Sequence, residues 1–172
     1  LGSTNGSYVN GHKVGEQVLR DGDKVQIGST TVLKFSYQDE TEQSFQRKIF
    51  DSAVKDGLTG IYNKKYFMEE IETDFAYAKR HRSPLTLLLF DIDHFKKIND
   101  THGHPAGDHA LRELSAIVKK TVRNEDVFAR FGGEEFAILM RDVDDAKALV
   151  VAEKVRRLIE AQVIQFDGVR LP

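Results

Sequence analysis

Hydrophobic and polar positions change their pattern twice along the chain, which predicts three segments of different structure. The first 36 residues hold short β-prone runs, at residues 7–9, 24–27 and 31–35, separated by Asn-Gly and Asp-Gly pairs. Such pairs tolerate left-handed backbone conformations and mark tight turns. This segment is therefore predicted to be part of an all-β sandwich.

The second segment, residues 37–55, is polar apart from one apolar stripe. Its apolar residues recur at helical spacing, which predicts a helix; they are Phe45, Ile49, Phe50, Ala53 and Val54. A helix this short is marginal in water by itself, so we expect its stripe to pack against something. Two interpretations stay open: the stripe docks on the chain's own domains, or two copies pair through it.

From residue 56 onward, strand and helix patterns alternate, which is typical of a central sheet flanked by helices. Helices are predicted over residues 64–80, 107–120 and 144–161, and a short one begins near residue 94. The first should bury Phe67, Ile71, Phe75 and Ala78. The apolar run at residues 87–90 predicts a strand covered on both faces.

Two hairpins are also predicted in this third segment. In residues 127–140, two β-prone runs flank Gly132 and Gly133, which predicts a tight turn that needs positive φ. A later hairpin is predicted to turn at Asp167 and Gly168.

Acidic residues follow the apolar runs at two places. Asp91 and Asp93 end the run at 87–90, and Glu134 and Glu135 follow the glycine pair. If the hairpin lies beside the strand, Asp91 and Glu134 face each other. Carboxylates together with substrate phosphates are the usual ligands of Mg²⁺, so the pattern predicts metal-assisted phosphoryl or nucleotidyl chemistry. The alternative is an ordinary hairpin with acidic residues at its solvent end.

Composition narrows the classes of protein. The chain has 172 residues, a net charge of -2 and 30% charged residues, so no basic field indicates binding to nucleic acid or to an acidic membrane surface. It has no cysteine, which excludes disulfides and thiolate metal sites. Its apolar runs are too short to span a bilayer and no signal-peptide pattern opens it, so we expect a cytoplasmic protein.

Three ordered motifs carry a resemblance to a known family. DGLTGIYNKKYF at 56–67, FDIDHFKKINDTHGHPAGD at 90–108 and GGEEF at 132–136 resemble the GGDEF family, the diguanylate cyclases. Residues 1–36, with STNG at 3–6, are similar to the C-terminal half of a forkhead-associated (FHA) domain, which binds phosphothreonine peptides.

The two resemblances imply a multi-domain α+β chain. A partial all-β FHA sandwich at 1–36 and a helical linker at 37–55 should precede an α/β GGDEF domain at 56–172, cyclase-like or palm-like, with a central sheet flanked by helices. We expect the chain to be truncated at both ends, because the family continues beyond the last hairpin and an FHA domain begins upstream of Leu1.

The GGDEF resemblance implies that two GTP molecules are condensed into cyclic di-GMP and pyrophosphate across a homodimer. It implies Mg²⁺, with Mn²⁺ as the alternative ion, held by Asp91, the Ile92 carbonyl and Glu134. Glu134 is also the candidate general base, and Glu135 is a weaker candidate ligand. Positions that match substrate contacts are Lys96, Asn99, His104, Asp108, Gly132 and Gly133.

Residue chemistry supports some of these substrate roles and offers alternatives. An amide at Asn99 and a carboxylate at Asp108 complement the hydrogen-bonding groups of guanine. Asp108 could equally cap its helix, and we expect both roles. Lys96 lies at the start of a helix whose free N–H groups could hold phosphates with it, or it is a solvated surface lysine.

Regulatory sites are implied at two further motifs. Arg123 and Asp126 have the spacing to GGEEF of the family's RxxD inhibitory product site; an exposed loop ion pair is the alternative. Thr4 and Asn5 match the FHA loop that holds the phosphopeptide, or they only form a turn. Two other functions stay open: a catalytically silent GGDEF receptor for cyclic di-GMP, and an FHA-based phosphopeptide scaffold.

Overall fold

The computed structural model describes residues 6–28, 30–37 and 40–171, and the chain divides into two compact units, Leu1–Ile49 and Phe50–Pro172. The predicted phosphopeptide contacts Thr4 and Asn5 lie outside the described residues.

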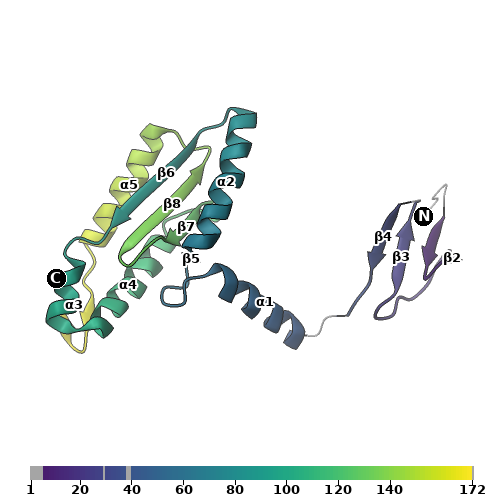
Figure 1. Ribbon diagram of the computed structural model, residues 1–172, viewed down its shortest axis with the longest axis horizontal. Coiled ribbons are helices and arrows are strands. Elements are labelled where there is room, and N and C mark those ends of the chain that lie inside the picture. Colours follow the sequence, from purple (N-terminus) through teal and green to yellow (C-terminus); the bar gives the residue numbers. More distant parts are fainter. Residues whose placement is uncertain (1–5, 29, 38–39, 172) are drawn as a thin grey trace. The chain divides into compact units, whose positions relative to one another are not determined.

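The smaller unit contains a four-stranded antiparallel sheet with the order β2-β1-β3-β4 (Figure 1). Its strands are β1 (Ser7–Val9), β2 (His12–Val14), β3 (Lys24–Ile27) and β4 (Thr31–Lys34). The turn between β1 and β2 has positive φ at Asn10 and Gly11, as predicted. The Asn10 side chain also donates a hydrogen bond to Asp23 (2.8 Å) and accepts one from the Lys24 N–H (2.9 Å), which ties this turn to β3.

Helix α1 (Glu40–Val54) occupies most of the predicted linker, and the boundary between the two units falls within it. Its apolar stripe is present, but Phe45, Ile49 and Phe50 are each more than half exposed. Pairing of two copies through this stripe stays a prediction.

The larger unit is built on a mixed sheet with the order β5-β7-β8-β6, and the predicted α/β architecture is confirmed. Strand β5 runs parallel to β7, whereas β8 is antiparallel to both β7 and β6. The strands are β5 (Tyr62–Asn63), β6 (Leu85–Asp91), β7 (Val127–Arg130) and β8 (Glu135–Arg141). The other elements are α2 (Lys64–His81), α3 (Phe95–His102), α4 (His104–Lys119), α5 (Asp145–Glu160), β9 (Gln165–Phe166) and β10 (Val169–Arg170).

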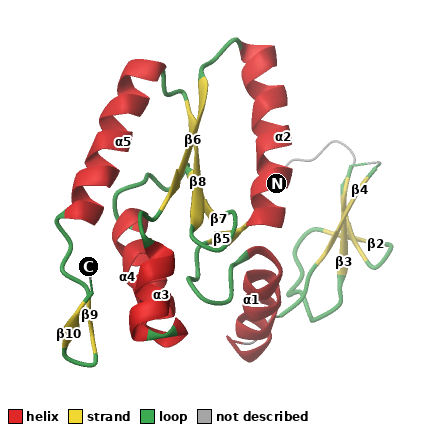
Figure 2. Cartoon of the chain, turned by 60° about the vertical axis from the view of Figure 1, so that its left-hand side comes forward, coloured by secondary structure: helices red, strands yellow, loops and turns green. Residues whose placement is uncertain are grey.

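Strand β8 lies at the centre of three layers. Helix α2 covers one face of the sheet, and α4 and α5 cover the other (Figure 2). Because side chains alternate along a strand, Ala137 and Leu139 pack with Phe67 of α2, whereas Phe136, Ile138 and Met140 enter the larger core on the opposite face. All five β8 side chains are at most 1% exposed. Strand β8 is therefore buried on both faces of the sheet.

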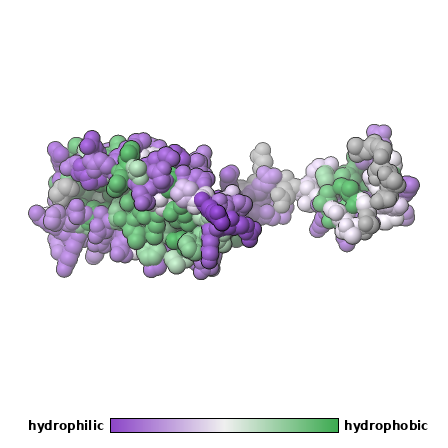
Figure 3. All heavy atoms as spheres, turned by 90° about the horizontal axis from the view of Figure 1, so that it is seen from above, coloured by the Kyte–Doolittle hydropathy of each residue, from purple (hydrophilic) through white to green (hydrophobic). Residues whose placement is uncertain are grey.

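In the described part of the chain β6 is an edge strand beside β8, and the prediction of a strand covered on both faces is wrong, because alternate side chains along it are exposed. Leu88 and Phe90 pack against the larger core, but Leu87 and Leu89 are 44% and 58% exposed. The α2 layer reaches Leu85 and extends no further along β6. Figure 3 shows a broad hydrophobic area on one face of the larger unit, bordered by hydrophilic residues.

Helix α2 also differs from its predicted pattern. Phe67 and Ala78 are buried as predicted, but Phe75 is 62% exposed, and the neighbouring Asp74 is 2% exposed. Asp74 forms an ion pair with Arg141 at the end of β8, and this hydrogen bond raises the pKa of Arg141. Glu70 lies 3.5 Å from the same guanidinium. The helix is thus joined to the central strand by a charge pair as well as by apolar packing.

Replacing Arg141 should destabilise the fold, because the Asp74 carboxylate would stay buried without its partner. We expect Arg141→Leu to lower the free energy of unfolding by about 2–3 kcal/mol, somewhat less than a fully buried pair, since Arg141 is partly exposed. Urea denaturation of the whole chain measures this change. The matched control is Arg156→Leu, which removes only exposed ion pairs with Glu153 and Glu160 and should change little. Equal losses in the two variants would contradict the assignment.

Candidate active site

The pairing of β6 with β8 fixes where the acidic residues lie. Asp91 is directly opposite Glu135, and Glu134 precedes it in the turn. The predicted meeting of strand and hairpin is therefore confirmed, but the register places Glu135, rather than Glu134, opposite Asp91.

These residues supply only oxygen ligands. Within residues 6–28, 30–37 and 40–171, no three His, Cys, Asp or Glu side chains are close enough to hold a metal ion alone. Mg²⁺ is usually bound by one or two carboxylates and completes its shell with phosphates and water. The carboxylates of Asp91 and Glu135, at one end of the paired strands, fit such an ion together with the carbonyl of Ile92, the residue after Asp91.

The hairpin turn is closed by the backbone of Glu135. Its carbonyl accepts hydrogen bonds from the N–H groups of Phe131 (2.8 Å) and Gly132 (3.3 Å). Neither Gly132 nor Gly133 has positive φ, so the predicted conformation of the turn is wrong. A Cβ at Gly132 would lie 2.2 Å from a carboxylate oxygen of Glu135, which is the flexible end of an exposed side chain. The absent side chain lets that carboxylate lie against the turn.

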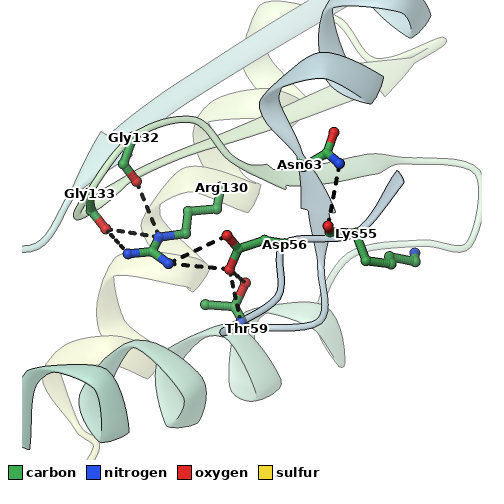
Figure 4. Close-up of polar contacts among 7 residues, drawn as sticks. All are labelled: Lys55, Asp56, Thr59, Asn63, Arg130, Gly132 and Gly133. Atoms are coloured by element: carbon green, nitrogen blue, oxygen red, sulfur yellow. Dashed lines mark hydrogen bonds and ion pairs between the residues drawn. The ribbon is translucent and has the colours of Figure 1, made fainter. Parts of the chain in front are cut away.

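Arg130 holds this turn from the end of β7 (Figure 4). Its guanidinium donates to the carbonyls of Gly132 (3.2 Å) and Gly133 (2.7 and 2.9 Å) and pairs with Asp56 (3.3 Å). Asp56 also accepts hydrogen bonds from the backbone N–H (2.9 Å) and hydroxyl (2.7 Å) of Thr59. We call this group of five residues the Arg130 clamp. It joins the DGLTG turn to the GGEEF turn.

Helices α3 and α4 carry the predicted substrate contacts. Lys96 and Asn99 lie on α3, and α4 begins at His104, three residues earlier than predicted. Asp108 is therefore in the second turn of α4, and the prediction that it caps the helix is wrong. The N-cap position is Gly103, with no side-chain hydrogen bond.

Gly107 brings the two helices into close contact. A Cβ at Gly107 would lie 2.0 Å from the Asn99 side-chain oxygen and 3.1 Å from the ring of Phe95. The Asn99 amide thus packs against the backbone immediately before Asp108. Asn99 therefore contacts α4 at the residue next to Asp108.

Arg123 and Asp126 form a closed turn between α4 and β7. The Arg123 N–H donates to one Asp126 carboxylate oxygen (3.0 Å), and the Asp126 N–H donates to the Arg123 carbonyl (3.2 Å). The second carboxylate oxygen is buried without a hydrogen-bond partner, and burial raises the pKa of Asp126. The Arg123 guanidinium makes no ion pair with Asp126, so the simple loop ion pair is not observed between these two described residues.

Comparison with known families decides the assignment of the larger unit. The profile described as "Diguanylate cyclase, GGDEF domain" matches residues 53–171, well over half of the chain. The chain belongs to the GGDEF family. The profile of the FHA domain matches residues 1–28.

Curated and solved GGDEF proteins agree with this assignment. The chain is 43% identical over 108 residues to the probable diguanylate cyclase DgcT of Escherichia coli, covering 63% of this chain and 24% of that protein. It is 39% identical over 127 residues to the response regulator PleD of Caulobacter vibrioides, covering 74% and 28%. The GGDEF domain of DgcB from Caulobacter crescentus, solved in complex with c-di-GMP, is 31% identical with a TM-score of 0.65, covering 67% of this chain and 66% of that one.

The GGDEF chain described here spans only about a quarter of the length of DgcT and PleD. In the part of it that the structure describes, no helix is long and apolar enough to cross a membrane.

The Arg130 clamp is the part of the site that the sequence did not reveal. Its two charged members are visible in the sequence as the aspartate that starts DGLTG and the arginine two residues before the glycine pair. They lie 74 positions apart. Nothing local to either motif indicates that they meet.

Asp56 should make the stability of the GGDEF unit depend on pH. Burial by itself would raise the pKa of Asp56, but the Thr59 hydrogen bonds and the Arg130 charge outweigh it and lower the pKa below 3.8. Stability from this carboxylate is therefore present above pH 3.8 and lost as the pH falls through the lower, folded-state value. We expect Asp56→Asn to reduce the free energy of unfolding by about 1–2 kcal/mol at pH 7 and by much less at pH 3. Urea titrations at the two pH values measure this, and a loss of equal size at both would contradict it.

Proposed function

We propose that this chain's GGDEF domain condenses two GTP molecules into cyclic di-GMP with release of two pyrophosphates. The observation that carries the proposal is the Asp91–Glu135 pair beside Glu134, at the end of the central sheet of a GGDEF-family domain. In the proposed reaction two GTP-loaded domains face each other. The 3′-hydroxyl of each GTP attacks the α-phosphate of the other and displaces pyrophosphate.

Asp91, the Ile92 carbonyl and Glu134 would hold Mg²⁺, or Mn²⁺ as the alternative, with Glu135 as a further candidate ligand. When bound, the ion would neutralise charge on the phosphates. Glu134 would accept the proton of the attacking 3′-hydroxyl. The Arg130 clamp supports this assignment, because it holds the carbonyls of Gly132 and Gly133 and so fixes the backbone next to Glu134.

The groups on α3 and α4 would bind the nucleotide. Asn99 and Asp108 would read the edge of guanine, since an amide and a carboxylate together match its donors and acceptor. Lys96, with the N-terminus of α3, would bind phosphates, and His104 would contact the substrate. The contact between Asn99 and Gly107 supports the base-reading pair, because it brings the amide next to Asp108.

Control of the enzyme would use the remaining motifs. Arg123 and Asp126 would bind cyclic di-GMP as an inhibitor, and this role is supported by the Arg123 guanidinium, which forms no ion pair with Asp126. The exposed stripe of α1 would help two copies meet. The FHA segment, with Thr4 and Asn5, would bind a phosphothreonine peptide and regulate that meeting.

The cyclase proposal is tested by Glu134→Gln, which keeps the size of the side chain but removes its charge and basicity. We expect formation of cyclic di-GMP from GTP and Mg²⁺ to fall at least about 100-fold, the usual minimum effect of a general base. Chromatography of the products measures the rate. Glu113→Gln on the exposed face of α4 is the matched control and should retain full activity. Absent turnover in the native protein, with cyclic di-GMP still bound, would instead indicate a receptor.

Base reading is tested by Gly107→Ala. Alanine favours a helix by about 1 kcal/mol over glycine, so the helix itself should tolerate it. The added methyl would displace the Asn99 amide, and we expect weaker GTP binding, with less preference for GTP over ITP, which lacks the exocyclic amino group. Calorimetric titration with each nucleotide measures this, and Ala116→Gly on the same helix is the control for propensity. An unchanged preference would argue against a base-reading role for Asn99.

A further inference from the structure

A small cavity lies beside the Arg123 turn, on the side of the domain where α1 ends. It has a volume of about 170 Å³. Its polar lining comes from four parts of the chain: Lys55 after α1, Tyr62 of β5, Lys119 at the end of α4, and Arg123 with Asp126 in the following turn. Residues that are far apart in the sequence therefore meet at this cavity.

The charges around this cavity are unbalanced. The Lys55 ammonium lies 3.4 Å above the ring of Tyr62. Burial, and then the nearby charge of Lys119, lower the pKa of Lys55, whereas Asp51 partly offsets them. With Arg123, three cations line the cavity.

The Asp126 carboxylate is the acidic group in the cavity lining, and it is already engaged by the Arg123 N–H. Lys55 is partly buried, whereas Lys119 and Arg123 are exposed, and like charges gathered around one cavity are stabilised when an anion binds between them.

We propose that Lys55 and Lys119 bind a phosphate group of cyclic di-GMP when the dinucleotide is held by Arg123 and Asp126. This inference rests on the proposed function and extends its inhibitory site by two residues outside the RxxD motif. The three cations that line the cavity suit a phosphate group, because it carries the opposite charge. The lysine ammonium groups suit a phosphate because they are point charges on flexible side chains. The planar guanidinium of Arg123 then stays available to bind the edge of a guanine base or two further oxygen atoms of the ligand.

The position of Lys55 gives this contact a regulatory consequence. Its N–H donates to the Asp51 carbonyl of α1 (2.8 Å), and its own carbonyl accepts a hydrogen bond from the Asn63 side chain (3.3 Å). Figure 4 shows the Lys55 side chain extending away from the Arg130–Asp56 pair. A phosphate held by Lys55 is therefore attached to the last turn of α1, the helix that would bring two copies together. Bound product would thus contact the residue that joins α1 to Asp56 of the Arg130 clamp.

The test is cyclic di-GMP binding by Lys55→Met and Lys119→Met, measured by calorimetry without GTP or metal. Each loss of a charged contact should weaken binding about tenfold, and the double variant should also show a smaller dependence on salt. Lys120→Met, an exposed neighbour outside the cavity, is the matched control and should bind as the native protein does. Thermal unfolding of each lysine variant without ligand checks that the domain stays folded, because Lys55→Met removes the contact of its ammonium with the Tyr62 ring as well as the repulsion from Lys119.

The inference is overturned if both lysine variants bind cyclic di-GMP normally while Arg123→Ala does not, or if the native protein binds none. Pyrophosphate is the other anion of the proposed reaction, and the same tenfold loss with pyrophosphate alone would overturn the assignment to the dinucleotide. Because binding is measured without turnover, an inactive protein that still shows the tenfold losses supports the lysine site. The cyclase proposal would fail separately.

Discussion

The antiparallel pairing of β6 with β8 is the constraint on which the candidate site depends. Its register is fixed by burial along β8, where alternate side chains from Phe136 to Met140 enter two different cores. A slip of one residue would exchange these faces, so the core resists it strongly. The same register sets Asp91 opposite Glu135 at the strand end. The two acidic positions are thus held opposite each other by apolar packing up to five residues away.

The Arg130 clamp makes a second connection of this kind. It joins a turn that follows the linker helix to the turn that carries Glu134, through one guanidinium that is 17% exposed. A planar fork with several donors suits this task, since it bonds two carbonyls and a carboxylate at once. Asp56 directly follows Lys55 at the end of α1, so the clamp connects the entry of the chain into this domain with the turn that carries Glu134.

Much of the fold could be predicted because its signals are local. The turns at Asn10–Gly11 and Asp167–Gly168 depend on residues that tolerate positive φ, and both adopt it. The long helices α2 and α5 begin and end within one residue of their predicted bounds, since each is preceded by a capping side chain, Asn63 or Asp144.

The errors share a different cause. Gly132 does not have the positive φ that its turn pattern predicts, and Asp108 is freed from capping because α4 starts at His104. The exposure of Leu87 and Leu89 depends on where α2 ends over the sheet. Burial of Asp74 depends on Arg141, far away in sequence. Each outcome is decided by packing between elements, which periodicity along one element does not contain. The predicted roles of the site residues depend mainly on the family resemblance.

Within the described residues β6 is paired on one side, by β8, which has a consequence for handling this chain in the laboratory. An edge strand with unpaired backbone groups and exposed leucines is a template on which another strand can add. Charged side chains and prolines are the usual natural protection against such pairing, and residues 85–90 contain neither. At high protein concentration this edge is where intermolecular sheet growth would begin. A lysine in place of Leu87 or Leu89 is the most direct way to improve colloidal behaviour without entering the core.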